Sequence, residues 1–181
     1  ENPIAKRFIK KFAFNEDELF ELSKYCNKIS LDFSSTPYSK KEADFLINKC
    51  KAPFIKVASM DINNLDYLKY IGKLKTAVII STGMATFEEI EIAVNTLNES
   101  GCSNLVVFHC VSIYPASPKL INLKNILKLN NAFPKCAIGY SDHTLGIDIG
   151  AASVLYGACV IEKHFTLDSL IIGMDNQMAI E

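Results

Sequence analysis

The feature that most constrains this 181-residue sequence is a regular recurrence of short, apolar, β-rich runs. Six runs follow one another at intervals of twenty-three to thirty-one residues: 29–35, 54–58, 77–81, 105–109, 136–140 and 159–163. Segments of helical length lie between them, at 40–49, 63–73, 86–99, 120–129 and 146–156, and one more helix is expected before the first run, over 15–26. Strands that alternate with helices predict βα units and a parallel sheet.

Small polar or ionisable residues follow nearly every apolar run. They include Thr36, Lys56, Ser59, Ser81, His109, Ser112, Tyr114, Ser141, His143, Lys163 and His164. In a (β/α) barrel such strand ends converge on one mouth, which holds the active site, whereas an open doubly wound sheet gathers ligands at a switch point in its strand order. Because all six runs contribute, we expect the barrel. A closed barrel needs eight units and about 250 residues, so six runs predict an incomplete one.

Two histidines, His143 and His164, each follow an apolar run, and they lie twenty-one residues apart. The segment 145–157 between them is rich in small residues and has helical length. Parallel strands joined by a crossover helix end at the same edge of a sheet. Two imidazoles at matching strand ends favour a metal site over two separate histidines that only satisfy nearby backbone groups. Imidazole suits several transition metals, so ligand type alone does not select one.

Composition excludes some classes of protein. Nineteen basic and twenty acidic residues leave a net charge of −1, without the broad positive field of a nucleic-acid binder. No apolar run is long enough to span a bilayer, and no secretory leader is expected. The six cysteines form no Cys-x-x-Cys pair, so we expect thiols in a reducing, cytoplasmic compartment. Cys110 follows His109 directly, but neighbours on a strand face opposite ways, so they are not assigned as a catalytic pair.

Six motifs at the strand ends, taken in order, are specific as a set: STP at 35–37, FIKVAS at 54–59, ISTGMAT at 80–86, HCVSIYP at 109–115, GYSDHTLG at 139–146 and EKHFTLD at 162–168. Over 29–181 the chain resembles the N-acetylneuraminate synthase (sialic acid synthase) family. The resemblance implies a (β/α)₈ TIM barrel in which residues 1–181 form part of the catalytic domain, roughly strands three to eight. The family's first two strands and its C-terminal antifreeze-like domain are expected to lie outside these residues.

The resemblance also implies an activity. Family members condense phosphoenolpyruvate with N-acetylmannosamine or a related N-acylated amino sugar, and they release phosphate. A divalent cation, Mn²⁺ with Mg²⁺ or Co²⁺ as alternatives, is implied at His143 and His164, which together with Lys56 are the expected catalytic residues. Thr36, Ser59, Ser81, Ser112 and Ser141 match positions that hold phosphoenolpyruvate, and Tyr114 and Asp175 match positions that contact the sugar. A cytoplasmic homodimer is implied for the full-length protein, with no nucleic-acid or membrane partner.

Two other interpretations stay open. The same barrel and residue types also serve other metal-dependent aldolases and sugar isomerases. Alternatively, the chain is a catalytically incomplete piece that acts as a binding module. The family's outlying segments supply an acidic residue, a second phosphoenolpyruvate-binding lysine and, across the dimer, a sugar-binding arginine. The 181 residues alone are therefore expected to have greatly reduced catalytic activity.

Overall fold

The computed structural model describes residues 10–171, 173 and 175–181, and its centre is a curved sheet of five parallel strands. The strands are β1 (Phe54–Val57), β2 (Ala77–Ser81), β3 (Leu105–Cys110), β4 (Ala137–Asp142) and β5 (Val160–Lys163). Each strand pairs with the next one along the chain, so the order β1-β2-β3-β4-β5 contains no reversal. An open doubly wound sheet requires such a reversal, and the described strands instead form the wall of a partial barrel.

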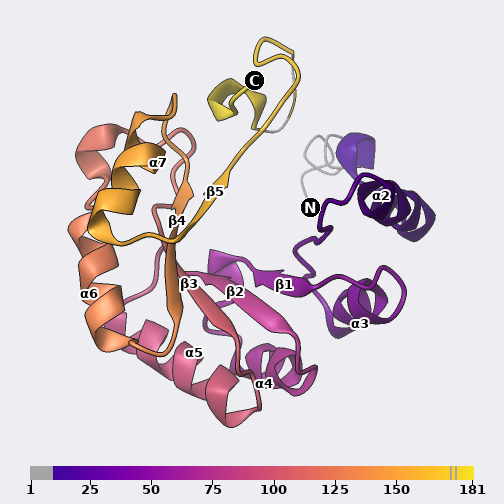
Figure 1. The fold of residues 1–181 in the computed structure, drawn as a ribbon, viewed down its shortest axis with the longest axis horizontal. Coiled ribbons are helices and arrows are strands. Elements are labelled where there is room, and N and C mark those ends of the chain that lie inside the picture. Colours follow the sequence, from indigo (N-terminus) through magenta and orange to yellow (C-terminus); the bar gives the residue numbers. More distant parts are fainter. Residues whose placement is uncertain (1–9, 172, 174) are drawn as a thin grey trace.

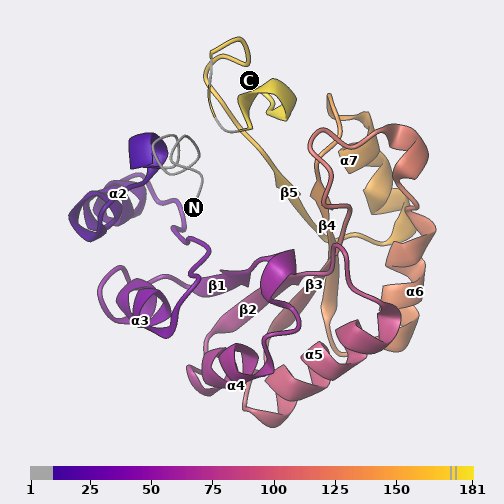
Figure 2. The ribbon, with the colours of Figure 1, turned by 180° about the vertical axis from the view of Figure 1, so that it is seen from behind.

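The helices that connect successive strands lie along the convex side of the sheet, and others precede the first strand (Figure 1). They are α2 (Glu16–Lys28), α3 (Lys40–Asn48), α4 (Leu65–Lys73), α5 (Phe87–Glu99), α6 (Lys124–Ala132) and α7 (Asp148–Ser153). Figure 1 shows α4, α5, α6 and α7 outside the arc of strands, with α2 and the C-terminal segment on its open side. Figure 2 shows the same arrangement from behind. None of the helices in the described part of the chain is long and apolar enough to cross a membrane.

The main core lies between the sheet and this outer layer of helices. Strand residues such as Ile55, Ile80 and Val107 are buried there against helix residues such as Leu68 and Leu97. Side chains alternate between the two faces of a strand, so the residues between these apolar positions face the inside of the arc. The strand pattern therefore places Lys56, Ser81 and Cys110 on the concave side.

Inside the arc, the aromatic ring of Phe108 fills the space below the strand ends, and Gly139 on the neighbouring strand makes room for it. A Cβ atom added at Gly139 would lie 2.4 Å from Phe108 Cε1 and 2.5 Å from the carbonyl oxygen of Val160. Both contacts are far inside van der Waals distance, so this position requires glycine. Phe108 is thereby fully buried, and its ring forms an apolar layer beneath the polar residues at the strand ends.

One predicted strand is wrong. Residues 31–37 form no strand, and a turn precedes them. The segment approaches β1 at one point, where the Ser34 hydroxyl donates a 2.6 Å hydrogen bond to the carbonyl oxygen of Phe54. A strand needs a ladder of such bonds, and Ile29 and Leu31 remain exposed. The described residues therefore contain five strands where six were expected. β1 and β5 are the ends of the sheet, so these residues close no barrel.

Two helix predictions are wrong in their bounds. The helix expected over 120–129 begins later, as α6, because residues from Pro118 to Leu120 form a separate 3₁₀ turn. The helix expected over 146–156 is divided into the short α7 and a 3₁₀ turn from Val154 to Tyr156. By contrast, α5 begins where its capping residues predict, since Thr86 and Glu89 form a capping box.

Candidate functional site

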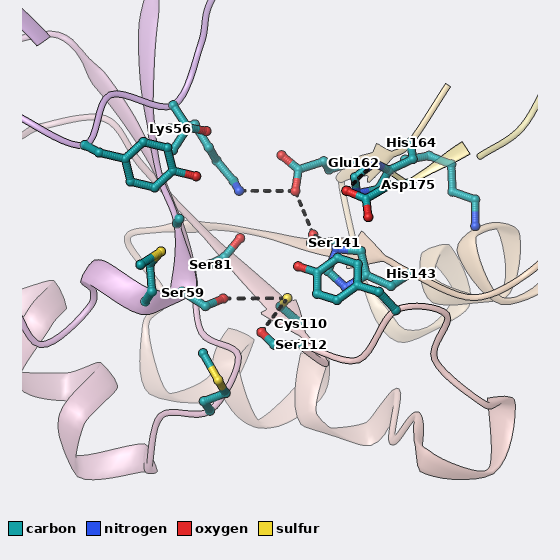
Figure 3. A pocket seen from close by; sticks show the side chains of 17 residues that line it. Lys56, Ser59, Ser81, Cys110, Ser112, Ser141, His143, Glu162, His164 and Asp175 are labelled. Carbon is teal, nitrogen blue, oxygen red and sulfur yellow. Dashed lines mark hydrogen bonds and ion pairs between the residues drawn. The ribbon is translucent and has the colours of Figure 1, made fainter. Parts of the chain in front are cut away.

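A cavity of about 630 Å³ lies at the carboxyl ends of the strands, on the concave side of the sheet. All ten site residues predicted from the sequence line it (Figure 3): Thr36, Lys56, Ser59, Ser81, Ser112, Tyr114, Ser141, His143, His164 and Asp175. The cavity also contacts residues that the sequence analysis did not assign, above all Cys110, Glu162 and Lys163. The strand-end positions of these polar residues thus predict where they gather. They do not by themselves say what the residues bind.

The register of the parallel sheet explains why three of these side chains are neighbours. Cys110 on β3 lies opposite Ser141 on β4, and Ser141 lies opposite Glu162 on β5. Residues that are partners in register point to the same face, so all three enter the cavity side by side. The sequence analysis did not assign Cys110 and Glu162 because their position beside Ser141 depends on this register, which no single segment of the sequence displays.

An ion pair crosses the cavity from the first strand of the sheet to the last. Lys56 Nζ lies 3.2 Å from Glu162 Oε1, and the Ser141 hydroxyl donates a 2.6 Å hydrogen bond to the same oxygen (Figure 3). The Lys56 ammonium also lies 5.8 Å from the centre of the Phe108 ring, within range of a cation–π contact. Although β1 and β5 are not paired, their side chains meet, which shows how strongly the sheet curves.

The floor of the cavity is a cluster of hydroxyl groups around one thiol. Ser59 Oγ accepts a 3.0 Å hydrogen bond from the backbone N–H of Gly83 and donates to Cys110 Sγ at 3.7 Å. Ser112 Oγ lies 3.9 Å from the same sulfur. Ser81 Oγ is buried and has no hydrogen-bond partner among the described residues. Its unused hydrogen-bonding capacity is available to a molecule in the cavity.

The electrostatics of Cys110 differ from what its sequence neighbours suggest. His109 points to the opposite face, as expected, but the imidazole of His143, one residue past the end of β4, lies beside the thiol. Burial opposes ionisation of Cys110, yet hydrogen bonding to His143 and the charge of that ring, with help from Ser59 and Ser141, lower the pKa of the thiol below its ordinary value. The thiol of Cys110 therefore ionises more readily than an ordinary cysteine thiol.

The two predicted metal-ligating histidines are neighbours. Their ring centroids lie 5.6 Å apart, a separation that an ion about 2 Å from one nitrogen of each ring can bridge. His143 Nδ1 lies 2.8 Å from the carbonyl oxygen of Val111. A carbonyl only accepts, so this nitrogen carries a proton, which leaves Nε2 as the nitrogen that can ligate a metal. The Tyr114 ring packs against the ring of His143 at a tilt of 37°, with ring centroids 4.2 Å apart.

Protein ligands beyond these two histidines are not assembled in the described part of the chain, where no group of three or more His, Cys, Asp or Glu side chains is placed to hold an ion. Asp175 Oδ2 lies 3.9 Å from Nδ1 of His164. Burial and the charge of His143 lower the pKa of His164. This favours the neutral, ligating form. The residues present thus fit an ion that takes its remaining ligands from water or substrate.

A buried ion pair holds the loop that carries His143. Lys163 Nζ lies 3.0 Å from Asp142 Oδ2 and also donates to the carbonyl oxygen of Thr144. Asp142 Oδ1 accepts hydrogen bonds from the Thr144 backbone at 2.9 Å and from its hydroxyl at 2.7 Å. The carbonyl oxygen of His143 accepts from the backbone N–H of Ala116 at 2.8 Å. The backbone at His143 is therefore fixed by contacts of the residues before and after it and by its own hydrogen bond with Ala116.

Comparisons with known proteins agree with this geometry. N,N'-diacetyllegionaminic acid synthase of Campylobacter jejuni is 45% identical over 163 residues, which is 89% of this chain and 48% of that protein. N-acetylneuraminate-9-phosphate synthase of Drosophila melanogaster is 40% identical over 168 residues, 93% of this chain and 45% of that protein. The chain thus spans about half the length of these curated relatives.

Solved structures resemble the fold over the whole chain. The crystal structure of N-acetylneuraminic acid (sialic acid) synthetase from Leptospira borgpetersenii, in complex with citrate, superposes with a TM-score of 0.95 and 33% identity. It covers 100% of this chain, which corresponds to 62% of that one. The model of the NeuB family matches residues 4–181. With this match and with relatives 40% and 45% identical over about nine-tenths of its length, the chain belongs to the NeuB family.

Proposed function

We propose that this chain supplies most of the substrate cavity of a synthase that joins phosphoenolpyruvate to an N-acylated amino sugar, such as N-acetylmannosamine, giving a sialic-acid-type nonulosonate and phosphate. The convergence of one lysine, several hydroxyls and two adjacent histidines on one cavity is the observation that carries the proposal. The names of the relatives support the class of product. Citrate in the Leptospira synthetase is, like phosphoenolpyruvate, a small polyanion.

Phosphoenolpyruvate would lie over Lys56 and the serine floor. An ammonium group has three donors, and Glu162 occupies one of those of Lys56, so the others can reach a phosphate or carboxylate. Ser81 Oγ has no partner in the described protein and would donate to the same anion. Charge-assisted hydrogen bonds of this kind both hold and orient the ligand.

The sugar would lie on the histidine side of the cavity, between Tyr114 and Asp175. A divalent cation, Mn²⁺ with Mg²⁺ or Co²⁺ as alternatives, would polarise the aldehyde oxygen of the open-chain sugar when bound at His143 and His164. His143 is prepared for this role because its Nδ1–H is fixed on the carbonyl oxygen of Val111, which leaves Nε2 as the nitrogen for the ion.

The residues then position two substrates for bond formation. The enol carbon of phosphoenolpyruvate attacks the aldehyde carbon, water adds to the resulting cationic centre, and the tetrahedral intermediate loses phosphate as its carbon–oxygen bond breaks. Lys56 would stabilise the negative charge that grows on the phosphate, and the Ser59, Ser81 and Ser141 hydroxyls would fix its direction. Such prearranged donors stabilise a transition state without reorganisation.

Release of phosphate from phosphoenolpyruvate in the presence of N-acetylmannosamine tests the proposal in the full-length protein. Lys56→Met should lower kcat/KM by about a hundredfold or more. Lys69→Met is the matched control, because Lys69 is exposed on α4 and lies away from the cavity, and it should leave turnover unchanged. An aldolase or isomerase would convert sugar without releasing phosphate, and that result would refute the proposal.

The family comparison also supports proposals about the assembly, the completeness and the location of the enzyme. We propose a homodimer in which segments outside 1–181 complete the barrel and the sugar site, so that residues 1–181 alone have little activity. We also propose a cytoplasmic location, because the six cysteines are free thiols, as a reducing compartment favours.

A further inference from the structure

A second cavity, of about 310 Å³, lies on the outer face of the sheet, between the end of β3 and the helices α5 and α6. Its walls are mainly apolar and include Phe87, Ile90, Leu120 and Leu129. β3 is paired on both sides, and both helices are described. This cavity is therefore complete within the chain and does not depend on closure of the barrel.

His109 lines this cavity, and one nitrogen of its imidazole has no partner in the described part of the chain. The residue is only 6% exposed, and Nε2 has no hydrogen-bond partner among the described residues. The nearby Thr82 hydroxyl is already used, since it donates to the carbonyl oxygen of Phe108. Stacking on Tyr140, with ring centroids 5.7 Å apart, fixes the orientation of the ring. A buried polar group left unpaired is costly, so a ligand that meets it gains from doing so.

The charged side chain that lines this cavity is a cation. Lys128 of α6 lines it, and no aspartate or glutamate does. Within the described ranges, Lys128 takes part in no ion pair. Asn125, one helical turn before it, adds an amide donor beside the ammonium. A cation and an amide at the rim of an apolar cavity favour a ligand with an anionic group and an apolar body.

We propose that this cavity binds a small carboxylic acid with an aromatic or aliphatic body, separate from the substrates of the strand-end cavity. The apolar body would lie against Phe87, Ile90 and Leu129, and the carboxylate would accept hydrogen bonds from Lys128, Asn125 and the imidazole of His109. A neutral imidazole still carries one N–H donor. Burial lowers the pKa of His109 to about 4, so the ring is neutral at pH 7.

The two cavities share a wall, and that gives the proposal a second readout. Met84 and Cys110 line both of them. Val111 lines the outer cavity, and its carbonyl oxygen accepts the 2.8 Å hydrogen bond from His143 Nδ1. An occupant of the outer cavity therefore alters the surroundings of His143 without touching it.

Histidine-ring NMR of the full-length protein, labelled at the ring carbons, tests the proposal with phenylacetate as the probe. The His109 signal is assigned by its loss in His109→Gln. Phenylacetate should shift this signal saturably and move the His143 signal by a smaller amount. Phenylacetamide, which lacks the charge, and acetate, which lacks the apolar body, should each bind at least about tenfold more weakly.

Lys128→Met should weaken phenylacetate binding about tenfold. Lys124→Met, on the same helix but outside the cavity lining, is the control and should bind normally. Because Lys128 is exposed, this comparison stays informative if His109→Gln does not fold. Equal binding of phenylacetate and phenylacetamide, or normal binding by Lys128→Met, would overturn the proposal. So would shifts at His143 and His164 with His109 unmoved, which would place the probe in the strand-end cavity. None of these outcomes depends on turnover.

Discussion

The Ser81 hydroxyl is 3% exposed and makes no hydrogen bond within the described chain. An unsatisfied buried group costs about 1–3 kcal/mol, so Ser81→Ala should keep the free energy of unfolding or raise it by up to about 1 kcal/mol. It should also raise KM for phosphoenolpyruvate. Urea unfolding and steady-state kinetics of the full-length protein measure the two effects.

Ser153→Ala is the matched control for this prediction. Ser153 is equally buried, but its hydroxyl donates a 2.6 Å hydrogen bond to the carbonyl oxygen of Gly150. Losing that bond should lower the free energy of unfolding by about 1 kcal/mol. If Ser81→Ala is the more destabilising of the two substitutions, Ser81 supports the fold and its assignment to a ligand is wrong.

His109 gives the molecule a stability that depends on pH. Burial lowers its pKa from 6.5 to about 4, so the unfolded chain takes up the proton first as the pH falls. The free energy of unfolding should therefore decline between pH 6.5 and 4, by about 3 kcal/mol from this group. Urea unfolding at several pH values should show a smaller decline in His109→Gln. His143 and His164 are present in both proteins, so their contributions to the free energy of unfolding cancel in the comparison.

Among the elements, the link between β4 and β5 depends on the pair formed by Asp142 and Lys163. Asp142 is 1% exposed, and Lys163→Met would leave its charge without a partner. We expect a loss of about 3–5 kcal/mol in the free energy of unfolding. Lys69→Met removes an exposed partner of Asp66 and should cost less than about 1 kcal/mol. Similar losses in both variants would show that the buried pair has no special role.

The secondary structure was largely predictable because strand and helix periodicities are local properties of the sequence. All five strands lie within two residues of their expected bounds. The run 29–35 has the same composition as a strand, but strand formation also needs a neighbour in register, which composition does not encode. The same holds for the site. The positions of Lys56 and the two histidines could be predicted because each lies at the end of a strand. Glu162 and Cys110 become visible only when the register places them beside Ser141.

On the scale of the whole molecule, the C-terminal segment exposes apolar side chains on the open side of the sheet. Leu167 is 90% exposed and Leu170 is 91% exposed, with Phe165 beside them. Exposed apolar patches and unpaired sheet edges promote association. The isolated 181-residue chain should therefore show a mass that increases with concentration in light scattering, and the double substitution Leu167→Ser and Leu170→Ser should reduce the increase. A monomer at all concentrations would contradict this expectation.

Two side chains, those of Met84 and Cys110, line the strand-end cavity and the outer cavity at once. Evolution at these positions must meet the packing requirements of two compartments with one residue. Replacing Cys110 with glycine would remove a side chain from the partition between the two cavities and would thin it. A substitution made at this position to reshape one cavity would therefore also alter the other.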